Sequence, residues 1–142
     1  SVEMLAKALV IEEAMAAGEL TTTYRMIGST LLEMNEFNRA VDYLEKCYEI
    51  EMERKSATKD ELAYQLGKLY KSREKFGSAI IYFERCAGTL NEALAEKSLK
   101  ELAILYERVG QKERLRHALR RLLVYEKNIE KKTTIAECIN LF

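Results

Sequence analysis

The sequence predicts an all-α protein folded as an α–α superhelix, a solenoid of about seven antiparallel helices. Two observations support this class. Large apolar residues recur three or four positions apart, which is the spacing of one helical face. A pattern of six positions also recurs three times along the chain. Fixed-period repetition with two helices per unit is the signature of an α-solenoid.

The repeated pattern places a small residue among large ones. Its six positions are separated by 1, 3, 9, 4 and 3 residues, and the copies lie 39 and 36 residues apart. A small residue lets two helices approach closely, and the large residues fill the space between them. The three copies are Ile27, Gly28, Leu31, Ala40, Leu44 and Cys47; Leu66, Gly67, Tyr70, Ala79, Phe83 and Cys86; and Leu102, Ala103, Tyr106, Leu115, Leu119 and Leu122.

This arrangement resembles the tetratricopeptide repeat (TPR) over nearly the whole chain. Tyr24 occupies the family's bulky first-helix position, Phe37 and Phe76 match its aromatic before the second helix, and Gly110 matches its turn glycine. The family's proline is absent, because the chain has no Pro, and the 39-residue period exceeds the usual 34. Both departures fit a lengthened second helix, as in long-period members (about 39 residues) similar to kinesin light chain and LGN-type adaptors.

The first elements follow from local start and stop signals. Residues 2–18 are expected to form the second helix of a preceding repeat, ending at Gly18, so that the chain would begin halfway through a repeat. Repeat 1 would take residues 21–56, with the three threonines at 21–23 offering N-caps. The 142 residues would then be a single domain cut from a longer array.

The later elements follow in the same way. Repeat 2 would take residues 58–90, and a helix break at Gly88 and Thr89 is favoured over a helix that runs on to about Ala93. Repeat 3 would take residues 91–130 and begin with Asn91 as an N-cap. Residues 133–142 would start a further repeat.

Composition favours a globular domain in a reducing compartment. The chain is 48% hydrophobic and 32% charged, with a net charge of zero. Its cysteines, Cys47, Cys86 and Cys138, are odd in number and have no CxxC spacing, which argues against a disulfide framework or a zinc site. We therefore expect a cytoplasmic protein with no membrane span.

The residues near the C-terminus include a basic cluster, RLRHALRR at residues 114–121. Helical spacing puts Arg114, His117 and Arg121 on one face, and Arg116 and Arg120 on a neighbouring face. A solvated face is the favoured interpretation, a contact with an acidic protein surface comes second, and RNA third. No aromatic residue is interleaved for base stacking, so we do not expect a nucleic-acid partner.

No motif for catalysis is present. His117 is the only histidine, and no carboxylate is placed in sequence to orient it as a general base. The chain lacks the GxxxxGK[ST], GxGxxG and HExxH patterns. We expect no enzyme activity, no catalytic residue, no cofactor and no metal.

The resemblance implies a concave surface lined by the first helix of each repeat, where family members hold peptide segments. Five cations on that surface would suit an acidic or C-terminal peptide. Ser29, Lys68 and Ile104 stand where carboxylate-clamp members carry Asn, so this chain departs from that mode of binding. The expected binding residues, chosen because they would face away from the second helix, are Thr22, Arg25, Ser29, Tyr64, Lys68, Lys71, Lys100, Ile104 and Arg108.

The sequence therefore predicts an adaptor or scaffold that binds a protein or peptide, with an acidic segment as the favoured partner. The alternatives are an architectural segment of a large assembly, contacting neighbours by its edges and convex face, and the peptide-sensing domain of a regulator. An RNA-binding repeat is a further alternative, and strong dependence of binding on salt would mark it. Self-association through exposed end helices also stays open.

Overall fold

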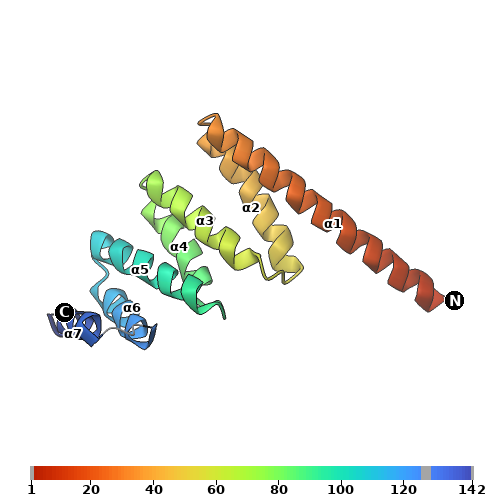
Figure 1. Ribbon diagram of the computed structural model, residues 1–142. Helices are drawn as coiled ribbons and strands as arrows, with labels where there is room; N and C mark the ends of the chain where they lie inside the picture. The colour runs from red at the N-terminus through yellow and green to blue at the C-terminus, as the bar shows by residue number, and fades with distance from the viewer. Residues whose placement is uncertain (1, 126–128, 142) are drawn as a thin grey trace. The chain divides into compact units, whose positions relative to one another are not determined.

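The computed structural model describes residues 2–125 and 129–141, and these residues form seven α-helices and no strand (Figure 1). This confirms the all-α prediction. The helices are α1 (Val2–Glu33), α2 (Phe37–Glu53), α3 (Lys59–Ser72), α4 (Phe76–Ala87), α5 (Glu92–Val109), α6 (Lys112–Tyr125) and α7 (Ile129–Leu141).

The chain divides into two compact units, residues 1–62 and residues 63–142. In the first unit, α1 and α2 form a helical hairpin around a tight turn, in which Asn35 adopts a positive φ of 59°. Gly28 of α1 faces Leu44 of α2, and a Cβ on Gly28 would lie 2.9 Å from the Leu44 Cδ2 atom. The repeat pattern predicted this close approach between its small and large positions.

The predicted helix end at Gly18 is wrong, because α1 runs unbroken through it for 32 residues. The threonines that were expected to cap a new helix instead bond back to the preceding turn. The hydroxyls of Thr21 and Thr22 donate to the Gly18 carbonyl at 2.9 and 3.0 Å, and the Thr23 hydroxyl donates to the Glu19 carbonyl at 3.0 Å. Hydroxyls can bond in this way inside a helix. A single interior glycine costs about 1 kcal/mol, which does not break a helix by itself.

The second unit holds the rest of α3 and α4 to α7 around one core. Gly67 of α3 lies against the ring of Phe83 on α4, and Phe83 is fully buried. Helix α5 packs on both α4 and α6, and α6 packs on α7. The buried residues of this core are Ala79, Ile80, Phe83, Ala87, Leu99, Leu102, Leu105, Tyr106, Leu115, Ala118 and Leu122.

The helix ends in the second unit mostly match the sequence signals. Helix α4 ends at Ala87, and the Asn91 side chain accepts a hydrogen bond from the Leu94 N–H, as an N-cap does. Gly110 closes α5 in the left-handed conformation, with φ 78°. Helix α7 begins at Ile129 and not at Thr133, since the intervening Glu and Lys residues favour a helix. The predicted end of the preceding helix near Asn128 lies outside the described residues.

The second helix of repeat 1 is longer than the second helix of repeat 2. Helix α2 has 17 residues and α4 has 12, and a turn at residues 54–58 follows α2. Lys55 in this turn has a positive φ of 53°. The extra residues behind the 39-residue period therefore lie in α2 and the turn that follows it.

Candidate functional site

In the first unit, the predicted binding residues are on α1 and differ in their surroundings. Thr22 and Ser29 are exposed. Arg25 instead contacts α2, with its Nη2 atom 2.5 Å from Oε1 of Glu51. The prediction that Arg25 points away from the second helix is therefore wrong, because Glu51 draws its guanidinium toward α2.

Glu51 is a buried charge, with 4% of its surface exposed. Burial disfavours the charge of Arg25, but the hydrogen bond and the charge of Glu51 outweigh it and raise the pKa of Arg25. Burial raises the pKa of the nearby Cys47 thiol, whose Sγ lies 3.6 Å from the Thr21 carbonyl oxygen. Within the described residues, Oε2 of Glu51 has no hydrogen-bond partner. This cluster belongs to the packing of α1 on α2.

In the second unit, ion pairs join the predicted residues of α3 to α5. The prediction that Tyr64 points away from the second helix is wrong, because its ring lies 5.5 Å from the ring of Phe83 on α4. Lys68 and Lys71 of α3 reach the same carboxylate on α5: their Nζ atoms lie 3.6 and 2.5 Å from the two oxygens of Glu101. Sequence reasoning missed Glu101, because an isolated Glu on a helix usually belongs to a solvated face. We call this surface the α3–α5 face, and its residues are Tyr64, Lys68, Lys71, Glu96, Lys100, Glu101, Ile104 and Arg108.

The other residues of the α3–α5 face combine cations with apolar groups. Lys100 pairs with Glu96 one turn earlier, at 3.1 Å. Arg108 lies over the ring of Phe76, 5.0 Å from its centroid. Ile104, between them on α5, is 51% exposed. The face therefore offers an exposed aliphatic side chain flanked by cations that contact neighbouring groups of the protein.

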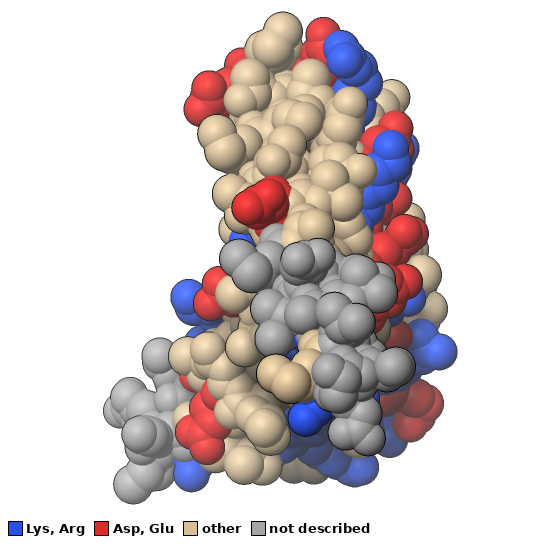
Figure 2. Space-filling view, turned by 90° about the vertical axis from the view of Figure 1, so that its right-hand side faces the viewer, with Lys and Arg blue, Asp and Glu red and all other residues tan. Residues whose placement is uncertain are grey.

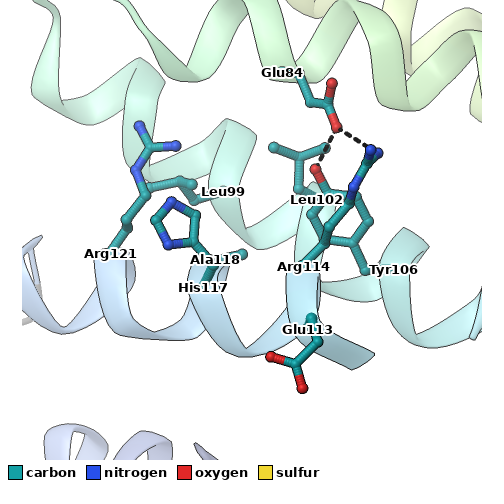
Figure 3. Close-up of a pocket in the computed structure, with 9 residues that line it drawn as sticks. All are labelled: Glu84, Leu99, Leu102, Tyr106, Glu113, Arg114, His117, Ala118 and Arg121. Atoms are coloured by element: carbon teal, nitrogen blue, oxygen red, sulfur yellow. Dashed lines mark hydrogen bonds and ion pairs between the residues drawn. The ribbon is translucent and has the colours of Figure 1, made fainter. Parts of the chain in front are cut away.

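Helices α4, α5 and α6 of this unit line a pocket of about 380 Å³ (Figure 3). Its floor is apolar and its rim is polar. We call it the α4–α6 pocket, and its lining residues are Glu84, Leu99, Leu102, Tyr106, Glu113, Arg114, His117, Ala118 and Arg121. Helical spacing correctly grouped Arg114, His117 and Arg121 on one face. The sequence alone gave no sign that this face lines a pocket, because three separate helices contribute to it.

At one end of the α4–α6 pocket, the polar side chains bond to one another. The Tyr106 hydroxyl donates to Oε1 of Glu84 at 2.6 Å, and Nη1 of Arg114 lies 3.4 Å from the same oxygen. Burial, and then the hydrogen bond to Glu84, raise the pKa of Tyr106 well above its ordinary value. At the other end, the Arg121 Nη2 donates to the Ala87 carbonyl at 3.1 Å.

Charges of both signs are interspersed on the surface. Figure 2 shows basic and acidic side chains next to one another along its right-hand edge. In the described residues, no group of three His, Cys, Asp or Glu side chains is arranged to hold a metal ion. None of the described helices combines the length and the apolar composition that crossing a membrane requires.

Comparison with protein-family models identifies a known repeat in this chain. The model for the tetratricopeptide repeat matches residues 22–51 and residues 60–88. The first match covers the second half of α1 and most of α2, and the second covers α3 and α4. Among curated proteins, none was found to match the chain.

Proposed function

We propose that this chain, which belongs to the tetratricopeptide repeat family, is a non-catalytic adaptor or scaffold that binds a segment of a partner protein on its α3–α5 face. Tetratricopeptide repeats generally mediate protein–protein interaction and scaffolding. The observation that supports this face is the exposed Ile104 near paired cations on α3 and α5.

The chemistry of the face favours an acidic segment. Its four cations, Lys68, Lys71, Lys100 and Arg108, outnumber the two carboxylates that pair with them. Exposed Lys–Glu pairs contribute only about 0–1 kcal/mol each, so an incoming carboxylate can replace an internal partner at small cost. An apolar side chain of the segment would pack on Ile104, and its carboxylates would contact the surrounding ammonium groups.

Contacts within the face already place its cations near one another, which favours binding without large rearrangement. Glu101 holds Lys68 and Lys71 together, and Arg108 rests on Phe76. Side chains that are already ordered lose less conformational entropy when a partner binds. We also propose a cytoplasmic setting, because none of Cys47, Cys86 and Cys138 forms a disulfide within the described residues.

The test is a selection of random dodecapeptides on the 142-residue chain, followed by affinity measurement on two charge-reversed variants. Lys68→Glu/Lys100→Glu changes the α3–α5 face. Lys112→Glu/Arg120→Glu changes the same number of charges on exposed residues of α6, outside this face. Among the acidic peptides selected on the unaltered chain, at least one class should bind the control variant normally and the face variant at least about tenfold more weakly.

Two outcomes would count against the proposal. Equal binding of every selected peptide to both variants would place the contact elsewhere and favour an architectural role through other surfaces. Equal loss in both variants would mean that general charge, and not this face, attracts the peptide. Circular dichroism of each variant should first show unchanged helicity.

A further inference from the structure

The α4–α6 pocket has a polar end that is satisfied and a cationic end that is not. Figure 3 shows Glu84, Tyr106 and Arg114 gathered at one end, where they bond to one another. His117 and Arg121 lie together at the other end, and neither of the two carboxylates that line the pocket, Glu84 and Glu113, lies beside them. Glu113 extends away from the pocket and pairs with Arg116 at 3.6 Å.

The two basic side chains at this end have donors available. A guanidinium carries five N–H donors, and the one hydrogen bond found for Arg121 within the described residues uses a single donor, to the Ala87 carbonyl. The ring of His117 makes no hydrogen bond or ion pair within the same residues and is exposed. This end of the pocket therefore presents the N–H groups of His117 and Arg121 to a bound ligand.

We propose that the α4–α6 pocket is a second protein-binding site, which takes an acidic side chain of a partner segment. Its carboxylate binds Arg121 and His117, and a neighbouring apolar side chain packs between the aliphatic stems of Arg114 and Arg121. This inference rests on the proposed protein-binding function but uses a different surface from the α3–α5 face.

The shape of the pocket supports an extended side-chain ligand. Arg114 and Arg121 lie seven residues apart on α6, which is about 10.5 Å along a helix axis. The stems of long basic side chains offer apolar surface while their heads stay in water. The floor under them, made by Leu99, Leu102 and Ala118, is apolar and nearly closed to solvent. At about 380 Å³ the pocket is large enough for one or two side chains.

Charge complementarity decides the class of ligand. The charge of Glu84 is engaged by Arg114 and by the Tyr106 hydroxyl, so it does not repel an anion at the far end. Carboxylates bind guanidinium groups through strong charge-assisted hydrogen bonds. A neutral apolar segment would leave the donors of Arg121 unpaired.

The experiment uses the same random dodecapeptide library, selected on the 142-residue chain and read out by NMR titration of the labelled protein. We expect a class of peptides with Asp or Glu beside an apolar residue, which shifts the signals of His117 and of the Arg121 side chain. His117→Glu and Arg121→Glu should each weaken this class at least about tenfold. Arg120→Glu, one residue away and exposed, is the matched control and should change affinity less than about twofold.

Each other outcome overturns the inference. Peptides that shift the pocket signals equally well with Asn or Gln in place of the acid would show that no carboxylate is bound. His117→Glu breaks no hydrogen bond or ion pair found in the folded chain, so it tests the site even if Arg121→Glu unfolds. Unchanged peptide affinity in His117→Glu would show that peptides do not bind at this end of the pocket. Saturable shifts with inorganic phosphate but with no peptide would indicate a small-anion site. Selected peptides that all depend on Lys68 and Lys100 would overturn the pocket and leave the proposed function standing.

Discussion

The ring of Phe83 on α4 occupies the space that any side chain on Gly67 of α3 would need. A Cβ at Gly67 would lie 2.9 Å from the Cε1 and Cζ atoms of Phe83. The same relationship joins Gly28 to Leu44, at the same positions of the preceding repeat copy. The small residue of the pattern is thus a direct requirement of helix packing in these two repeats.

Gly67→Ala should therefore destabilise the protein. Overpacking against Phe83 costs about 1–3 kcal/mol, which exceeds the gain of about 1 kcal/mol for alanine over glycine in a helix. Gly77→Ala is the control, because nothing lies within 4 Å of a Cβ there. Urea unfolding should show a loss for Gly67→Ala and no loss for Gly77→Ala. Equal stability of the two variants would disprove the assigned packing.

Removing the cation beside Glu51 should cost more than removing an exposed one. Arg25→Met leaves the buried Glu51 carboxylate without its partner, and we expect a loss of about 1–3 kcal/mol in the free energy of unfolding. Arg39→Met breaks an exposed pair with Glu36 and should cost less than about 1 kcal/mol.

A double-mutant cycle measures the buried pair itself. Arg25→Met/Glu51→Leu removes both charges, so it should recover part of the stability that Arg25→Met loses. If the double variant is less stable than Arg25→Met, a buried unpaired charge is not the cause of the stability lost in Arg25→Met.

Local signals predicted much of the fold. The Asn91 cap and the Gly110 turn follow from residue types whose side chain or backbone freedom suits one position. The Gly67–Phe83 contact follows from the repeat spacing. In contrast, Gly18 has the residue type of a helix stop, but its carbonyl accepts bonds from Thr21 and Thr22 inside a continuous helix.

Less of the candidate binding surfaces could be predicted from the sequence. Lys68 and Lys71 were predicted, but Glu101 between them was not, because pairing across α3 and α5 depends on the packing of separate helices. The α4–α6 pocket was missed for the same reason. Tyr106 was identified as a repeat position, and its hydrogen bond to Glu84 appears only once α4 and α5 are placed.

Stability should fall in alkaline solution through Tyr106. Its raised pKa means that the folded state keeps the proton while the unfolded state loses it near the ordinary value of about 10. The unfolded state then binds fewer protons, so the free energy of unfolding decreases as pH rises above about 10, by up to about 1.4 kcal/mol per pH unit from this group. Below about pH 9 the contribution is constant.

Tyr106→Phe isolates this effect from the other tyrosines. Urea unfolding at several pH values from about 9 to 11 should give a shallower decline for the variant than for the unaltered chain. Parallel declines would show that Tyr106 ionises normally in the folded state.

The three thiols should react at different rates. Cys47 and Cys86 are buried, and burial raises the pKa of Cys47, so both should label slowly with a thiol reagent in the folded protein. Cys138 on α7 is only half-buried and should label first. Mass spectrometry of the labelled protein identifies the order, and rapid labelling of Cys47 and Cys86 would mean that the helix registers are wrong.

The central claim, that the α3–α5 face binds a protein segment, is tested most directly by NMR mapping on the labelled chain with a peptide selected on it. Binding at this face should shift the backbone amide signals of residues 64–71 and 100–108, and the Ile104 methyl signals most of all. Saturable shifts confined to other residues, with these signals unchanged, would contradict the claim.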